Sequence, residues 1–130
     1  METHRRDLGT GFQDDRGTIL PIEHELGNVQ VIWSKAGAIR ANHFHKSDTH
    51  SCYLVTGSMD YYWRNHGEQS IQKESFVSGT KFTTGPLIDH EMVFLTDSIM
   101  IVVSEFKRDP VSYDEDIVKI SPLHEEYERV

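Results

Sequence analysis

Apolar and polar residues alternate along most of the chain in short runs that turn-forming residues separate. Residues 58–64, for example, place Met59, Tyr61 and Trp63 on one face of an extended strand. A helical period is confined to residues 112–116 and 123–129. We interpret ten runs as strands: 18–22, 29–34, 41–45, 50–55, 58–64, 68–72, 75–78, 81–83, 89–95 and 98–105. Many short strands with turn signals between them predict an all-β sandwich or barrel.

The domain organisation expected from the sequence is simple. A length of 130 residues suits one domain with its own core, and no internal repeat or linker is visible. Residues 109–130 are interpreted as an acidic C-terminal extension, because seven acidic and two basic side chains there carry −5 of the formal net charge of −8. The run Tyr113–Asp116 is interpreted as a solvated face or a helix start.

Charge and composition exclude some functional classes. The basic residues cluster only at Arg5-Arg6 and Lys107-Arg108, which argues against a nucleic-acid-binding protein. We find neither the apolar segment of a signal sequence nor an apolar run that could span a membrane. We therefore expect a cytoplasmic protein without a membrane partner, and its single cysteine, Cys52, agrees with a reducing compartment. A small-molecule ligand, including a small anion, stays compatible with the charge.

Three histidines lie close together in the sequence at one predicted hairpin. His43 and His45 share a strand face, because alternate side chains point the same way, and His50 begins the next strand. A lone histidine in a strand is most often an ordinary half-exposed or hydrogen-bonded side chain. Two imidazoles close together on an inward face repel each other when charged and need hydrogen-bond partners when neutral, which makes a purely structural role less favourable. The spacing therefore indicates a metal site.

These residues resemble the two signature motifs of the cupin superfamily. The first motif covers residues 37–57, with Gly37, His43, His45 and Gly57 at the expected gaps and His50 where a Glu is usual. The second covers residues 79–94, where Gly79 and His90 stand at their motif positions. Gly85 replaces the usual Pro, and Leu87 the usual second Gly.

The cupin resemblance implies a single-domain jelly-roll β-barrel over residues 1–130, with a site in the mouth of the barrel. It also implies that four side chains converge there as ligands of a divalent transition metal such as Zn, Fe, Ni or Mn: His43, His45, His50 and His90. Cys52 shares the histidine face, but a small buried side chain is the expected role of a lone strand cysteine.

A narrower resemblance is carried by Asp15-Arg16-Gly17 and residues 20–23 and 39–46, which look like cupins acting on deoxythymidine-diphosphate-linked keto sugars. Those 3,4-ketoisomerases and 3,5-epimerases use a histidine to move protons next to the sugar ketone without a metal. The resemblance implies His43 or His45 as the catalytic base. Ala41 replaces the usual Gly, and no counterpart of the ketoisomerase tyrosine stands at residues 31–33.

The same resemblance implies candidate substrate-binding residues. Arg40, Lys46 and Arg64 are candidates to contact phosphates, and aromatic side chains are candidates to line the pocket: Tyr61, Trp63 and Phe94. Ordinary core packing is the alternative for each aromatic residue. Strict alternation turns Arg40 away from His43 unless a β-bulge intervenes. His66 and Asp89 are interpreted as turn residues, and His124 as a surface residue.

The sequence leaves three functions open. The first is a metal-binding sugar-nucleotide epimerase or ketoisomerase, expected to be a homodimer because such relatives pair. The second is a metal-dependent dioxygenase or lyase acting on a small organic acid. The third is a cupin that binds a small molecule without catalysis.

Overall fold

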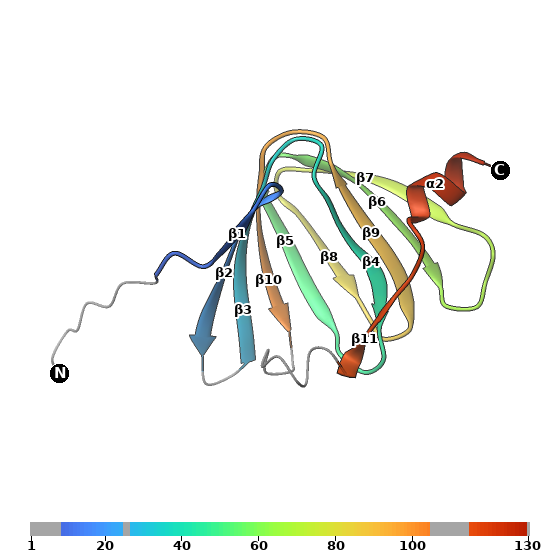
Figure 1. Cartoon of the computed structure of the whole chain (residues 1–130), viewed down its shortest axis with the longest axis horizontal. Helices are drawn as coiled ribbons and strands as arrows, with labels where there is room; N and C mark the ends of the chain where they lie inside the picture. Colours follow the sequence, from blue (N-terminus) through green and yellow to red (C-terminus); the bar gives the residue numbers. More distant parts are fainter. Residues whose placement is uncertain (1–8, 25–26, 105–114, 130) are drawn as a thin grey trace, which may run out of the picture.

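The computed structural model describes residues 9–24, 27–104 and 115–129, and nearly all regular structure in them is β-strand (Figure 1). The strands are β1 (Phe12–Asp14), β2 (Gly17–His24), β3 (Gly27–Ser34), β4 (Ile39–His45), β5 (His50–Thr56), β6 (Ser58–Asn65), β7 (Gln72–Val77), β8 (Thr80–Thr84), β9 (Ile88–Phe94), β10 (Ser98–Ser104) and β11 (Ile117–Lys119). A short helix, α2 (Leu123–Glu128), follows β11. This helix is too short to cross a membrane, and the described residues contain no helix that could.

The strands form two antiparallel sheets that face each other. Six strands follow one another in the order β1-β2-β3-β10-β5-β8, and five in the order β11-β4-β9-β6-β7. Neighbours in space are often distant in sequence, as in β10 between β3 and β5, which is the connectivity of a jelly roll. The predicted all-β, single-domain jelly-roll architecture is confirmed.

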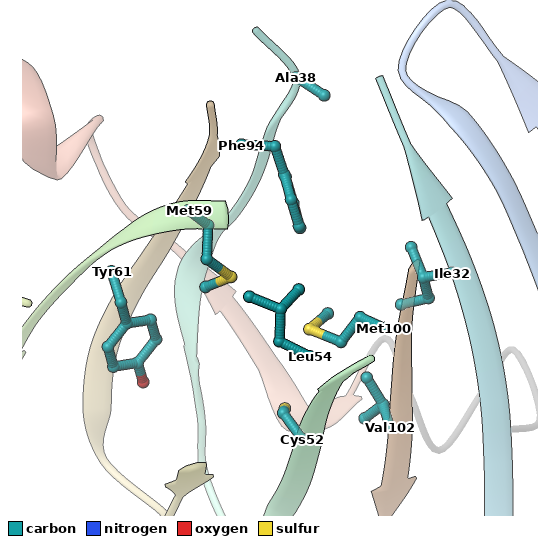
Figure 2. Packing of buried hydrophobic residues seen from close by; sticks show 9 residues of the cluster. All are labelled: Ile32, Ala38, Cys52, Leu54, Met59, Tyr61, Phe94, Met100 and Val102. Atoms are coloured by element: carbon teal, nitrogen blue, oxygen red, sulfur yellow. The ribbon is translucent and has the colours of Figure 1, made fainter. Parts of the chain in front are cut away.

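The hydrophobic core fills one part of the space between the sheets. Figure 2 shows Leu54, Met59, Phe94 and Met100 pointing toward one another, and each is at most 1% exposed. Ile32 lies beside them in the same cluster. Along β5 and β9 the inward-facing positions change from histidine at the start of the strand to large apolar residues near its end. The packed core therefore anchors the two strands that carry His50 and His90.

The structure departs from the predicted elements in three places. The predicted strand over residues 68–72 is wrong, since residues 66–71 form a turn and coil and β7 starts at Gln72. The alternation pattern did not reveal the three-residue strands β1 and β11. Residues 109–114 and 130 of the predicted acidic extension lie outside the described residues. The rest of that extension packs on the barrel, with β11 pairing with β4.

A β-bulge interrupts β4 between its arginine and its histidines. Ala41 pairs with Glu91 and His43 pairs with His90, so Asn42 is the additional residue on the β4 side. Ala41 and Asn42 both have positive φ, at 72° and 59°. The bulge shifts the alternation by one position, so Arg40 and His43 line the same cavity. The arginine orientation that simple alternation predicts is therefore wrong.

We predict that Ala41→Gly stabilises the protein. An alanine at positive φ costs about 1–2 kcal/mol relative to its preferred conformations, and glycine removes this strain. Glycine also gives the unfolded chain more conformational freedom, which lowers the free energy of unfolding by about 0.4–1 kcal/mol. The free energy of unfolding, measured by urea titration, should rise by about 0.5–1 kcal/mol. Ala38→Gly is the control, because Ala38 is buried and does not have positive φ, and it should lower stability. A loss in both variants would contradict the strain argument.

Candidate metal centre

Three imidazoles from two neighbouring strands form the centre of the site. His43 and His45 come from β4 and His90 from β9, and one nitrogen of each lies within 4.8 Å of the others. The ring centroid of His43 lies 4.9 Å from that of His45 and 4.7 Å from that of His90. The centroids of His45 and His90 are 5.5 Å apart. The bulge and the β4–β9 pairing thus gather these three predicted ligands on one inner face.

The hydrogen bonds of His45 fix which of its nitrogens can bind a ligand. Its Nδ1 lies 2.9 Å from Oδ2 of Asp116, and a carboxylate oxygen accepts, so Nδ1 carries the proton. Nε2 is then the nitrogen with the free lone pair. That atom is buried and has no hydrogen-bond partner among the described residues, and the whole side chain is only 1% exposed. An unpaired buried acceptor costs about 1–3 kcal/mol. A cation bound to this nitrogen would remove that cost.

His90 has the same arrangement of donor and acceptor nitrogens. Its Nδ1–H donates to the carbonyl oxygen of Ile88 at 2.9 Å, which leaves the lone pair on Nε2. Burial lowers the pKa of His90 to about 3, and the neighbouring His45 and His50 act in the same direction. The imidazole is therefore neutral near pH 7, as a metal ligand must be.

His50 lies beside this group rather than within it. Its ring centroid is 4.2 Å from that of His45, and its Nε2 lies 3.0 Å from Oδ2 of Asp48. His45, Asp48 and His50 form a second set of possible ligands that shares His45 with the first. The four predicted ligand histidines are therefore neighbours, but they divide into a group of three and a histidine–carboxylate pair.

The residues present fit a divalent transition metal. Three imidazole nitrogens form a donor set that suits Zn, Fe, Ni and Cu. In His45 and His90, hydrogen bonds to Nδ1 direct the Nε2 lone pair away from the supporting group, which is the usual arrangement around ligating histidines. Cys52 is less suited, because burial raises the pKa of its thiol to about 12 and keeps it protonated.

A cavity of about 210 Å³ lies next to the histidines. His43, His50 and His90 line it together with Arg16 and Arg40. Other lining residues come from both sheets: Ile19, Gln30, Ile32, Ala41, Cys52, Phe82, Thr84, Met92 and Val102. Arg16 forms an ion pair with Asp14 at 2.6 Å, so Arg40 is the guanidinium group that makes the cavity suitable for an anionic ligand.

Arg40 is held in place without a carboxylate partner. It donates from Nε to Oγ of Ser34 at 2.9 Å and from Nη2 to the carbonyl oxygen of Trp33 at 3.3 Å. The residue is 6% exposed, and among the described residues it makes no ion pair. Burial, followed by the nearby Arg16, lowers the pKa of Arg40, while Asp14 opposes this shift. A guanidinium still stays protonated, so an anion in the cavity would gain a buried positive partner.

The other predicted substrate-binding residues do not line this cavity. Lys46 is exposed after β4, and Arg64 forms ion pairs with Asp89 and Glu126. The aromatic residues belong to the core or pack against it: Tyr61, Trp63 and Phe94. The Tyr61 hydroxyl is hydrogen-bonded to Thr84, and burial raises the pKa of Tyr61.

Several functional contacts escaped the sequence interpretation. Asp116 lies in the run interpreted as a solvated face or a helix start, yet it is 8% exposed and accepts a hydrogen bond from His45. Asp89 was interpreted as a turn residue, but it lies in β9 and is 1% exposed. His124, expected at the surface, is paired with the fully buried Glu91. Only for Asp48 was there a sequence signal, a carboxylate two residues before a candidate ligand.

Comparison with known proteins finds similar solved structures but no similar sequences. No protein-family model matches the sequence, and no curated protein is similar to it in sequence. The capsular polysaccharide assembling protein CapF from Staphylococcus aureus has a TM-score of 0.77 and 21% identity, with 85% of this chain and 34% of CapF covered. This chain therefore spans about a third of the length of CapF.

Two further neighbours are enzymes. The 3,4-ketoisomerase QdtA from Thermoanaerobacterium thermosaccharolyticum, solved with TDP, has a TM-score of 0.60 and 22% identity, covering 82% of this chain and 79% of its own. Oxalate decarboxylase from Bacillus subtilis has a TM-score of 0.68 and 16% identity, covering 90% of this chain and 34% of its own. At these identities the likeness concerns the fold. The chain accordingly has the cupin fold, with its histidine cluster between the two sheets.

Proposed function

We propose that this protein is a metal-binding cupin enzyme that moves a proton next to the ketone of a nucleotide-linked sugar, as an epimerase or ketoisomerase does. The observation that carries the metal part is the buried Nε2 of His45, which has no hydrogen-bond partner in the part of the chain that the structure describes. His43 and His90 offer nitrogens within 4.8 Å of the His45 ligand atom, so all three would hold the ion. A bound divalent ion supplies a Lewis acid that polarises a carbonyl oxygen.

We assign proton transfer to His50. A histidine whose lone pair holds a cation cannot accept a proton, so the base expected at His43 or His45 is better placed on a neighbour. His50 lines the cavity, and its Nε2–H donates to Asp48, which orients the ring. An orienting carboxylate also stabilises the imidazolium formed when a proton is accepted. His50, predicted from the motif as a fourth ligand, thus becomes the acid–base residue of this proposal.

The sugar-nucleotide assignment is supported by charge and size. The cavity volume of about 210 Å³ is below the roughly 300–1,000 Å³ of typical ligand pockets, so a sugar ring would enter and the nucleotide would lie outside. Arg40 would neutralise an anionic group, and Arg16, with 41% of its side chain exposed, reaches solvent. QdtA, a structural neighbour, was solved with TDP. Lys46 as a phosphate contact and the homodimer stay predictions.

The metal assignment predicts that the purified protein binds close to one equivalent of a divalent transition metal. His45→Ala and His90→Ala should each reduce the bound metal to below about a tenth of an equivalent, because each removes one of three nitrogen ligands. Elemental analysis after gel filtration measures this. His66→Ala is the control, since that side chain is 47% exposed and pairs with Asp89 outside the cluster. Wild-type protein that retains no metal when supplied with it would disprove the assignment.

The low pKa of His90 predicts a pH dependence of stability in the metal-free protein. The unfolded chain binds the His90 proton below about pH 6.5, whereas the folded protein binds it only below about pH 3. The free energy of unfolding should therefore fall as the pH drops through this window, by at most about 1.4 kcal/mol per pH unit from this group. His90→Gln should show a shallower slope in urea titrations between pH 7 and 5. Equal slopes would contradict a neutral His90.

The catalytic assignment predicts deuterium exchange next to the ketone. Metal-loaded protein incubated in D₂O with a deoxythymidine-diphosphate-linked 4-keto sugar should incorporate solvent deuterium, as measured by mass spectrometry. His50→Gln should slow exchange by about 10²–10⁴-fold, the usual contribution of a general base, while His66→Gln should leave it unchanged. Equal exchange rates for His50→Gln and wild type would remove His50 from the mechanism.

A second candidate is a metal-dependent lyase or dioxygenase for a small organic acid. It is favoured by the buried Arg40 and by a cavity too small for a whole nucleotide. Under this alternative the exchange experiment gives no deuterium incorporation, and the thermal midpoint rises with oxalate or another small acid but not with deoxythymidine diphosphate. A ligand-induced shift without turnover of any ligand would instead indicate the non-catalytic binding protein.

A further inference from the structure

Asp116 joins the C-terminal segment to the histidine cluster through both of its carboxylate oxygens. Oδ2 accepts the Nδ1–H of His45 at 2.9 Å. Oδ1 accepts the backbone N–H of Ser47 at 2.8 Å and lies 3.4 Å from the backbone nitrogen of Asp48. Within the described part of the chain, every partner of this carboxylate is therefore a donor. A carboxylate has acceptor sites on both of its oxygens, which suits this set of donors.

The backbone fixes this carboxylate relative to the ring it supports. Asp116 immediately precedes β11, in which Ile117 pairs with His45 of β4. The backbone N–H of Lys46 donates to the Asp116 carbonyl oxygen at 2.8 Å. Further along, the backbone N–H of Ile120 donates to the carbonyl oxygen of Asn42, the bulge residue. The segment is thus attached to β4 on both sides of its histidines.

This geometry determines the tautomer of His45. With Oδ2 of Asp116 in contact with Nδ1, the proton resides on Nδ1 and the lone pair on Nε2, the buried atom for which residues 9–24, 27–104 and 115–129 provide no hydrogen-bond partner. The reverse tautomer would place two acceptors against each other at Nδ1 and bury an unpaired N–H at Nε2. Both changes are unfavourable.

We propose that Asp116 is a positioning residue of the metal centre: it holds His45 in the Nδ1–H tautomer and so presents Nε2 as a ligand. This inference rests on the proposed metal site and extends it to a residue beyond both cupin motifs. A carboxylate behind a ligating imidazole also raises the basicity of the ligand nitrogen. The C-terminal segment therefore completes the site rather than merely covering it.

A second carboxylate–histidine pair of the same kind provides a matched control. Glu91 is 0% exposed, and it accepts the backbone N–H of His124 at 3.0 Å and the His124 Nδ1–H at 2.8 Å. This pair also ties the C-terminal segment to the barrel. Neither residue belongs to the two sets of possible metal ligands among the described residues. Glu91→Gln thus tests the loss of a buried carboxylate without a change at the metal centre.

Asp116→Asn should weaken zinc binding by about 10–100-fold, the usual effect of losing such a supporting carboxylate. Asparagine has one acceptor oxygen for two donors, so its amide either faces His45 Nδ1 or loses the Ser47 hydrogen bond. Chelator competition with Zn²⁺ measures the affinity. The zinc affinity of Glu91→Gln should stay within about threefold of that of wild type, even if its thermal midpoint falls by as much as that of Asp116→Asn. Equal zinc affinities for Asp116→Asn and wild type would overturn the proposal.

Nitrogen-15 NMR of the histidine rings tests the tautomer directly in protein stripped of metal. Wild type should show His45 protonated at Nδ1, and Asp116→Asn should shift the population toward the Nε2–H form, while Glu91→Gln leaves it unchanged. An Nε2–H tautomer in wild type would overturn the proposal even if Asp116→Asn does not fold. Wild-type protein that binds no zinc but has the expected tautomer would instead show that the metal assignment failed, with Asp116 still orienting the ring.

Discussion

One additional residue in β4 determines what faces the interior of the barrel. Because Asn42 bulges out of the pairing with β9, Arg40 and His43 both line the cavity, although three positions separate them. In a regular strand, residues three apart point to opposite faces. Without the bulge, either the guanidinium or the imidazoles would face outward. The meeting of a buried positive charge and a set of neutral nitrogen ligands therefore depends on a local irregularity that costs backbone strain at Ala41 and Asn42.

That strained segment is stabilised from outside the barrel by the C-terminal segment. The Asn42 carbonyl accepts from Ile120, and its side-chain oxygen accepts from the backbone N–H of Leu123, the first residue of α2. On the outer face, Arg64 bridges Asp89 of β9 and Glu126 of α2. Buried charges are tolerated when they are paired in this way. Acidic residues in 115–129 therefore make two contacts that a solvated face would not make. Asp116 accepts a hydrogen bond from His45, and Glu126 pairs with Arg64 and so attaches α2 to the barrel.

The sequence predicted much of the fold and part of the site, for identifiable physical reasons. Alternation with a period of two located the long strands, and motif spacing named the histidines that cluster. Alternation could not reveal the bulge, since Ala41 and Asn42 carry no glycine signal for positive φ. It also could not pair Asp116 with His45, because 71 residues separate them and a three-residue strand makes the connection. Side chains such as Arg64, predicted at the pocket, follow strand parity to the outer face instead.

His50 departs from the cupin motif, and its hydrogen bond to Asp48 explains how the structure accommodates this difference. Where the motif usually has a carboxylate, this chain has an imidazole, and the carboxylate stands two residues earlier, at Asp48, bonded to that imidazole. The pair keeps an acidic group near the cluster but places a titratable nitrogen on the cavity wall. A carboxylate ligand would partly cancel the charge of a bound cation, whereas three neutral imidazoles leave it undiminished. Under the proposed function, this substitution leaves the charge of the ion to polarise a carbonyl and provides His50 for proton transfer.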